Sequence, residues 1–147
     1  MSSSPRPRPP AVRDPLTGLP PLAAFAEALA HARRHAEVAV VAIDIDGFSA
    51  FNDARGHQAG NRALVGVAAA LSSALRQGDE LFRIVDDQFA AIITIRERGE
   101  AEHVARRLRD AVATTGSITV SVGVAVPRHL EPGEDVLPRA ERALRDG

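Results

Sequence analysis

The feature that most constrains the fold of this chain is an apolar run at residues 38–43. It reads Val-Ala-Val-Val-Ala-Ile, and polarity returns abruptly at residues 44–47, Asp-Ile-Asp-Gly. A run with no polar residue on either face predicts a strand that is buried on both sides. Such a strand needs helices above and below its sheet. We therefore expect an α/β sandwich with this strand inside it.

Helical and β patterns occupy most of the remaining chain. Five helices are predicted, at residues 21–35, 48–54, 57–75, 100–114 and 134–145. Three further strands are predicted, at residues 81–85, 88–95 and 118–126, and the first two form a β-hairpin. The last strand alternates strictly, with Ile and Val on one face and Thr, Ser, Gly and Ala on the other, so its small face invites a closely packed helix. The order of elements predicts an α/β sandwich with a mixed sheet.

Composition limits the functions that the chain can have. At 147 residues it is long enough for one domain, which we expect at residues 12–147 after a flexible Pro-, Arg- and Ser-rich tail at residues 1–11. The net charge of −1 creates no field that would attract nucleic acid or an anionic membrane, and no apolar run reaches the length of a membrane span. The absence of cysteine excludes thiolate catalysis and cysteine zinc sites, and fits a reducing cytoplasm. All 18 basic residues are arginine, which excludes a phosphate-binding lysine and a Schiff base.

Two carboxylates stand at the ends of predicted strands. Asp44 follows the apolar run, and Asp87 lies at the tip of the predicted hairpin. If the hairpin pairs beside the strand at 38–43, these side chains converge at one edge of the sheet. Carboxylates at such an edge suit a site for Mg²⁺ and a nucleoside triphosphate, because hard cations take oxygen ligands. The alternative is that acidic residues gather there only because turns are polar.

Five segments resemble, in order and spacing, the motifs of one family. They are residues 14–20 (Asp-Pro-Leu-Thr-Gly-Leu-Pro), 44–53, 56–60 (Gly-His-Gln-Ala-Gly), 83–89 (Arg-Ile-Val-Asp-Asp-Gln-Phe) and 121–125 (Ser-Val-Gly-Val-Ala). By these segments the chain is identified as a degenerate member of the GGDEF family of diguanylate cyclases, over about residues 12–145. The resemblance implies a nucleotidyl-cyclase-like fold with a central mixed, mainly antiparallel five-stranded sheet flanked by helices. It also implies an ancestral reaction in which two GTP molecules condense to cyclic di-GMP across a dimer, with two Mg²⁺ ions.

The resemblance implies roles for several residues. Asp44 and Asp87 would be metal ligands, helped by the backbone carbonyl of Ile45, and Asp87 would be a vestigial catalytic residue. Asn52 would hydrogen-bond the guanine base of the substrate. Asn61 stands where the family has aspartate, and an amide turns a donor toward a guanine donor, which costs about 1–3 kcal/mol. Asn61 therefore indicates either an altered base preference or a polar residue in a pocket that is no longer used.

The hairpin departs from the family signature Arg-x-Gly-Gly-Asp-Glu-Phe at three positions. Val85 and Asp86 replace both glycines, and Gln88 replaces the second acid. Glycine lets a phosphate approach the backbone closely, whereas Val85 favours strand geometry, so the turn must change shape. Asp86 adds a negative charge that would repel a triphosphate by roughly 1–4 kcal/mol at about 4 Å. Ser49 also stands where the family has a lysine that neutralises the triphosphate, so we expect weak Mg²⁺ binding and weak or absent cyclase activity.

A second candidate site precedes the hairpin. The segment at residues 76–79, Arg-Gln-Gly-Asp, begins nine residues before Val85 and resembles the Arg-x-x-Asp site at which many diguanylate cyclases bind their product. The fork of Arg76 suits phosphates and guanine edges, and Asp79 can accept from guanine N–H groups. Arg107 resembles the arginine that completes such a site from a neighbouring subunit. The alternative is coincidence, since the chain has 18 arginines.

Three functional hypotheses follow. The first is a degenerate GGDEF domain that binds cyclic di-GMP or a protein partner as a signalling module, with a homodimer or a protein complex expected. The second is a working cyclase of low activity or altered nucleotide preference, which uses GTP and depends on Asp44 and Asp87. The third is a structural module that dimerises or docks a partner and binds no nucleotide. Turnover assays separate the second from the others, and a cyclic di-GMP titration separates the first from the third.

Overall fold

A computed structural model describes residues 12–116 and 118–146 of the chain, and the tail predicted at residues 1–11 lies outside this part. Helices and strands follow one another in the predicted order. They are α1 (Leu22–His35), β1 (Val38–Ile45), α2 (Phe48–Arg55), α3 (His57–Ala74), β2 (Glu80–Val85), β3 (Gln88–Thr94), α4 (Glu100–Ala113), β4 (Val120–Ala125) and α5 (Gly133–Asp146). None of these helices is long and apolar enough to cross a lipid bilayer.

The strands form one sheet in the order β2–β3–β1–β4, and all three strand pairs are antiparallel. The expected α/β sandwich with a mainly antiparallel sheet is therefore confirmed, but two details differ. The described residues form four strands rather than five, because they contain only four β-patterned runs. The predicted mixed sheet also differs, because no two strands of the described residues pair in parallel. A parallel bridge joins Pro21 and Arg83, outside the strand pairs.

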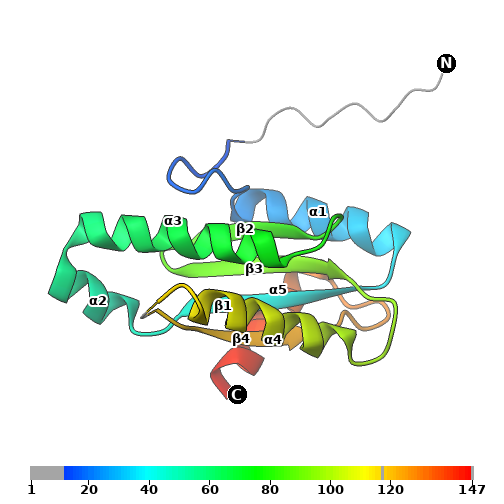
Figure 1. Cartoon of the computed structure of the whole chain (residues 1–147). Coiled ribbons are helices and arrows are strands. Elements are labelled where there is room, and N and C mark those ends of the chain that lie inside the picture. The colour runs from blue at the N-terminus through cyan, green and yellow to red at the C-terminus, as the bar shows by residue number, and fades with distance from the viewer. Residues whose placement is uncertain (1–11, 117, 147) are drawn as a thin grey trace.

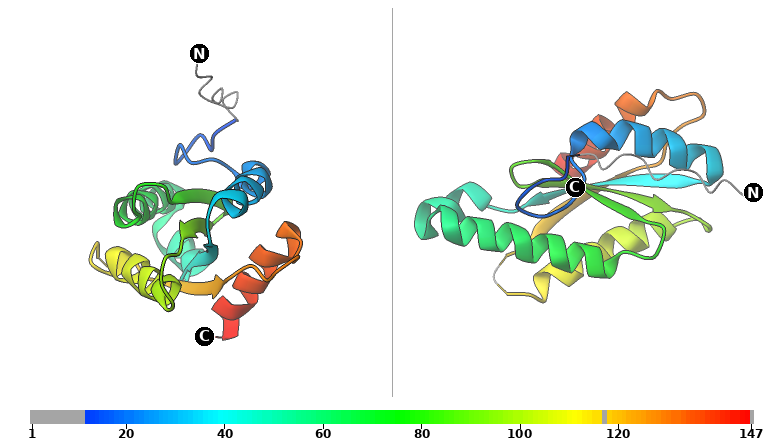
Figure 2. Two further views of the ribbon diagram at one scale, coloured as in Figure 1. Left: turned by 90° about the vertical axis from the view of Figure 1, so that its right-hand side faces the viewer. Right: turned by 90° about the horizontal axis from the view of Figure 1, so that it is seen from above.

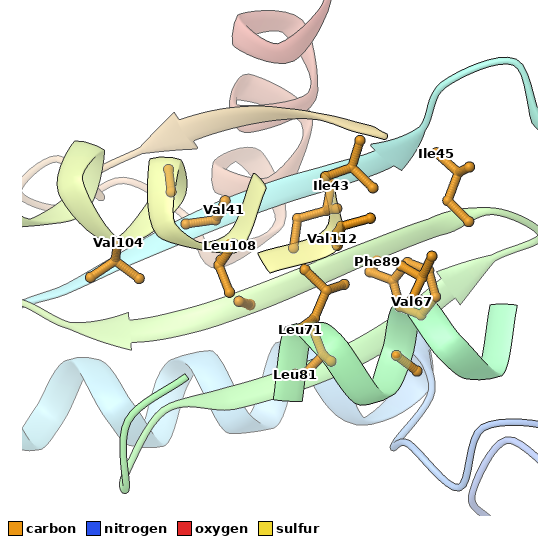
Figure 3. Close-up of a cluster of buried hydrophobic side chains, with 14 of the residues drawn as sticks. Val41, Ile43, Ile45, Val67, Leu71, Leu81, Phe89, Val104, Leu108 and Val112 are labelled. Carbon is orange, nitrogen blue, oxygen red and sulfur yellow. The ribbon is translucent and has the colours of Figure 1, made fainter. Parts of the chain in front are cut away.

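Helices cover both faces of the sheet. α3 and α4 lie on one face, and α1 and α5 lie on the other (Figures 1 and 2). Val41 and Ile43 of β1 belong to the core cluster on the α3 and α4 side (Figure 3). Val40 belongs to the second cluster, on the α1 and α5 side. The apolar run has no polar face because β1 is buried by helices on both sides.

The small-residue face of β4 lets α5 pack close to the sheet. Gly123 is buried, and a Cβ atom there would lie 2.2 Å from the backbone nitrogen of Leu144 and 2.3 Å from the carbonyl oxygen of Ala140. Only glycine leaves room for the α5 backbone at this distance. The close helix predicted from the small face is confirmed. It brings the last turns of α5 beside Asp44, at the end of β1.

Candidate functional site

The hairpin between β2 and β3 has a two-residue tip in spite of its altered residues. Val85 ends β2 and pairs with Gln88, the first residue of β3, so Asp86 and Asp87 form the turn. The register shifts between Arg83 and Val85, which is a β-bulge. Asp86 has a left-handed backbone, with φ of 48°, a region that glycine enters freely and aspartate more readily than most residues. The turn thus retains a glycine-like backbone at Asp86 and accommodates Val85 through the bulge.

Arg83 anchors this tip to the turn that precedes α1. Its guanidinium donates to both carboxylate oxygens of Asp14 at 3.1 Å, and to the carbonyl oxygen of Asp86 at 2.8 and 3.1 Å. Thr17 donates its N–H and its hydroxyl to the same carboxylate. Burial alone would raise the pKa of Asp14, but the hydrogen bonds from Thr17 and Arg83 outweigh it and lower the pKa below its ordinary value. One arginine therefore fixes the backbone next to Asp87.

Asp44 and Asp87 lie together at this end of the sheet, and we call them the carboxylate pair. Asp44 is opposite Gln88 in the β1–β3 ladder, and the N–H of Ile45 donates to the carbonyl oxygen of Asp87 at 3.2 Å. Burial raises the pKa of Asp44, and the charge of Asp87 and a hydrogen bond shared with its carboxylate raise it further, to about 6. The charge of Asp46 acts in the same direction.

The carboxylate pair has the chemistry of a partial site for a hard divalent cation. The two groups repel each other, and Oδ1 of Asp44 is buried without a hydrogen-bond partner. A Mg²⁺ ion would satisfy that oxygen and relieve the repulsion, with Asp87 and the carbonyl of Ile45 as the other candidate ligands. Among the described residues, no group of three His, Cys, Asp or Glu side chains is arranged to bind a metal ion. Water or a ligand phosphate would therefore complete the coordination.

Asp46 binds the neighbouring strand. Its carboxylate accepts from the hydroxyl of Ser121 at 2.6 Å and from that of Thr119 at 2.7 Å, and its N–H donates to the Thr119 carbonyl at 2.9 Å. Sequence reasoning gave Asp46 no role, because this contact depends on the β1–β4 register, in which Ser121 lies opposite Asp44. Asp46 thus joins β1 to β4 and adds its charge to the field at Asp44.

A small cavity adjoins Asp44 under the last turns of α5. It has a volume of about 20 Å³, and its walls include Asp44, Gln88, Leu144 and Arg145. This volume has room for about one water molecule or ion. Arg145 lowers the pKa of Asp44, although burial and the neighbouring acids outweigh it. The last turns of α5 therefore place Arg145 beside Asp44 at the edge of this cavity.

The two candidate base-binding amides lie where α2 meets α3. The side chain of Asn52 packs against Gly60, where a Cβ atom would lie 1.7 Å from Oδ1 of Asn52. That oxygen is buried and has no hydrogen-bond partner. An unpaired buried amide oxygen costs about 1–3 kcal/mol, so a ligand that satisfied Asn52 would gain affinity. Asn61 follows Gly60 on α3 and is exposed to solvent.

Arg76, Asp79, Thr94 and Glu100 form a network that we call the arginine clasp. Arg76 donates from Nε to Asp79 at 3.1 Å, from Nη2 to the carbonyl oxygen of Thr94 at 2.6 Å, and from Nη1 to Glu100. The side chain of Asp79 is only 1% exposed, and it also accepts from the N–H groups of Arg76 and Thr94 at 3.0 and 3.1 Å. Every side-chain nitrogen of Arg76 therefore has a partner. The clasp joins the loop after α3 to the end of β3 and the start of α4.

Glu100 and Thr94 are the members of the clasp that the sequence does not predict. One carboxylate oxygen of Glu100 accepts from Arg76, and the other accepts from the N–H groups of Arg96 and Glu97. The bond from Arg96, followed by those from Arg76 and Glu97, lowers the pKa of Glu100 to about 2. The contact with Glu100 also raises the pKa of Arg76. An acid at the start of a predicted helix signals contacts with nearby backbone N–H groups, but gives no sign of a distant arginine.

Arg107 is a residue of α4, and its side chain reaches the C-terminal end of α3. Its Nε and Nη2 atoms donate to the carbonyl oxygen of Ala74, the last residue of α3, at 3.1 and 2.6 Å. A cation in this position caps the helix and complements its dipole. Arg76 follows Ala74 by two residues, so the bond from Arg107 and the clasp hold neighbouring parts of the chain at the end of α3.

Comparisons with known proteins agree with this architecture. A family model described as diguanylate cyclase, GGDEF domain, matches residues 11–147. Diguanylate cyclase DgcP of Pseudomonas aeruginosa is 36% identical over an alignment 147 residues long, gaps included. The alignment covers 91% of this chain and 22% of DgcP. The chain therefore spans about a fifth of the length of that relative.

Two solved structures show the same fold. Diguanylate cyclase SiaD of P. aeruginosa, in complex with its activator SiaC, has a TM-score of 0.83 and 33% identity, over 91% of this chain and 56% of the SiaD chain. The GGDEF domain of DgcB from Caulobacter crescentus, in complex with cyclic di-GMP, has a TM-score of 0.83 and 28% identity, over 95% of this chain and 91% of that one. Since the family model covers nearly the whole chain, the chain belongs to the GGDEF domain family of diguanylate cyclases.

Proposed function

We propose that the chain is a degenerate GGDEF domain that acts in cyclic di-GMP signalling as a nucleotide-binding regulatory module, with weak or no diguanylate cyclase activity. It would bind cyclic di-GMP through Arg76, Asp79 and Arg107, and would act in the bacterial cytoplasm as a homodimer or with a protein partner. Support for these ligands comes from two similar proteins: DgcB was solved with cyclic di-GMP, and SiaD with its activator SiaC.

One observation carries the binding part of this proposal. Arg107 donates to the last carbonyl of α3, and Arg76 follows that helix by two residues. The planar guanidinium forks of Arg76 and Arg107 suit a ligand with two phosphates and two guanine bases, because arginine binds phosphate oxygens and guanine edges in pairs and stacks on bases. Asp79, whose side chain is 1% exposed and accepts from Arg76 and two backbone N–H groups, would act by holding Arg76 in position.

The hairpin tip supports the low activity that we propose. Asp86 has a glycine-like backbone but adds a carboxylate next to Asp87. A triphosphate at about 4 Å would be repelled by roughly 1–4 kcal/mol. Gln88 lacks the second acid of the signature, and Ser49 lacks the positive charge of the family's lysine.

The two alternatives each have an observation in their favour. A working cyclase is favoured by the convergence of Asp44 and Asp87, whose unpaired oxygen suits a catalytic cation. A structural module without nucleotide is favoured by the clasp, because Arg76 already has partners at every side-chain nitrogen. GTP turnover would distinguish the first alternative, and the absence of cyclic di-GMP binding would distinguish the second.

Calorimetric titration with cyclic di-GMP tests the proposal. Arg107→Gln is the informative variant, since Arg76→Ala would also break the clasp. Arg106→Gln is its matched control, because Arg106 is exposed on the same helix and has no hydrogen bond or ion pair among the described residues. We expect binding by the wild type, about tenfold weaker binding by Arg107→Gln, and no change in Arg106→Gln. A wild type that gives no heat, or variants of equal affinity, would count against the proposal.

A further inference from the structure

Glu100 occupies the side of the Arg76 guanidinium that a ligand phosphate would need. Its carboxylate accepts from Nη1 of Arg76, while Asp79 and Thr94 accept from the other two nitrogens. We infer that Glu100 is an internal competitor for the ligand, whose carboxylate must leave Arg76 before an anionic phosphate binds there. This inference rests on the proposed binding of cyclic di-GMP and adds to it a residue that sets the affinity.

Exposure identifies Glu100 as the exchangeable member of the clasp. The Arg76 and Glu100 side chains are 33% and 18% exposed, so their contact lies at the surface. The Asp79 side chain is 1% exposed and accepts from two backbone N–H groups as well as from Arg76. Displacing Asp79 would leave those donors unpaired, which is costly in a buried site. A phosphate that reaches Arg76 from solvent would therefore replace Glu100.

The second carboxylate oxygen of Glu100 can keep its bonds while the first releases Arg76 to a phosphate. It accepts from the N–H groups of Arg96 and Glu97, at the start of α4. These bonds do not involve Arg76, so they can persist when the other oxygen releases the guanidinium. A phosphate brings the same charge-assisted bonding to Arg76 that the carboxylate provides. Binding would thus exchange one anion for another, without rearrangement of the sheet or of α4.

Competition of this kind lowers the apparent affinity for the ligand. The observed dissociation constant equals the intrinsic constant divided by the fraction of molecules in which Glu100 has released Arg76. In the conformation described here, Arg76 is bonded to Glu100. A variant that releases Arg76 and leaves the rest of the clasp intact should therefore bind cyclic di-GMP more tightly than the wild type.

Glu100→Gln is such a variant. Its amide oxygen can still accept from the N–H groups of Arg96 and Glu97, but its NH₂ group presents donors to the guanidinium of Arg76. Glu102→Gln is the matched control, with the same charge change on the same helix turn, at an exposed residue without a hydrogen bond or ion pair in the described part of the chain. Calorimetry with cyclic di-GMP should give about tenfold tighter binding for Glu100→Gln and less than about a twofold change for Glu102→Gln.

A second variant protects the test against misfolding of the first. Glu100→Asp retains the charge at the start of α4, but its shorter side chain withdraws from Arg76, so a smaller gain in affinity is expected. Thermal melting would establish that each variant is folded. If neither Glu100 variant binds more tightly than Glu102→Gln, the inference is wrong, while binding by the wild type still supports the proposed function.

Other outcomes separate the inference from the proposed function. If the wild type gives no binding and Glu100→Gln binds, the inference stands, and the wild-type domain is not itself a cyclic di-GMP receptor. If no variant binds cyclic di-GMP, Glu100 conceals no site, and both the inference and the binding part of the proposed function are wrong.

Discussion

The carboxylate pair and the arginine clasp differ in whether their acidic side chains have hydrogen-bond and charge partners. In the pair, Asp44 and Asp87 face each other, and one buried oxygen has no partner. In the clasp, Asp79 and Glu100 accept from Arg76 and from backbone N–H groups. Unsatisfied polar groups reduce stability and attract a ligand, whereas satisfied networks stabilise the fold and must be broken by one. The first region should therefore gain from a cation, and the second should resist its proposed ligand.

Removal of Arg76 should have the largest effect on stability. In Arg76→Ala the Asp79 carboxylate, which is 1% exposed, loses its counter-ion. We expect the free energy of unfolding to fall by about 3 kcal/mol, since breaking one side of a buried ion pair costs several kcal/mol. Urea unfolding measures this loss, with Arg106→Ala as the exposed control, expected to change by less than about 0.5 kcal/mol. Equal stabilities of the two variants would show that the clasp is not structural.

A substitution in the carboxylate pair should raise the free energy of unfolding, whereas removal of Arg76 should lower it. Asp87→Asn removes the like charge beside Asp44, so the free energy of unfolding at about pH 7.5 should rise by about 1–2 kcal/mol. Urea unfolding measures this gain, with Asp53→Asn, at an exposed acid on α2, as the control. A loss of stability in Asp87→Asn at neutral pH would mean that the Asp87 carboxylate makes a net favourable contact.

The pH dependence should separate the two regions. The pKa of Asp44 is raised from 3.8 to about 6, so its contribution to stability is fully present below about pH 3.8 and is lost as the pH rises through 6. The pKa of Glu100 is lowered from 4.5 to about 2, so its contribution is present above about pH 4.5 and is lost as the pH falls toward 2. The advantage of Asp87→Asn over the wild type should therefore shrink between about pH 7.5 and pH 4. An advantage that does not change with pH would contradict the assignment to Asp44.

A divalent cation should stabilise the carboxylate pair more modestly. At about five times its dissociation constant, Mg²⁺ would add roughly 1 kcal/mol to the free energy of unfolding. For a domain of this size the melting temperature should rise by about 2–5 °C. Asp44→Asn should abolish the rise, and NaCl of the same ionic strength should not reproduce it. An equal rise in the wild type and in Asp44→Asn would place the cation elsewhere.

The smallest change is expected at the hairpin tip. Asp86→Gly relieves the left-handed backbone of a non-glycine residue, where φ is 48°, but it increases the freedom of the unfolded chain. These effects oppose each other, so the free energy of unfolding should change by less than about 1 kcal/mol. Asp86→Ala is the control, since alanine lacks the local hydrogen bonding that favours aspartate in this region. Greater loss of stability in the glycine variant than in the alanine variant would contradict this account of the turn.

The fold could be predicted where the signal is local. The apolar run of β1 and the small face of β4 report burial and residue size directly, and both led to the correct helix layers. Gly123 fits that prediction because its missing side chain is a local property of the strand that fixes how near α5 comes. The bulge before Val85 was not predictable, because β2–β3 register is decided by the turn and the core together.

The candidate site could be predicted only in part, because some of its contacts join residues that are far apart in the sequence. The proximity of Asp44 and Asp87 follows once the hairpin is paired with β1, which was the assumption made from the sequence. The bond between Arg76 and Glu100 spans 24 positions, and the bond between Asp46 and Ser121 spans 75. No local pattern reports such contacts, because they depend on how a loop and a strand end meet in three dimensions. The family motifs predict a site at Arg76 and Asp79, but they give no sign that Glu100 of the same chain bonds to Arg76.

We propose that this GGDEF domain accepts a cation and a cyclic dinucleotide but turns over GTP very slowly or not at all. Overnight incubation of the purified protein with GTP and Mg²⁺ or Mn²⁺, followed by chromatographic detection of cyclic di-GMP, tests it most directly. We predict no product above a blank without protein. Product that forms with the wild type and disappears with Asp87→Asn would contradict the claim and identify a working diguanylate cyclase.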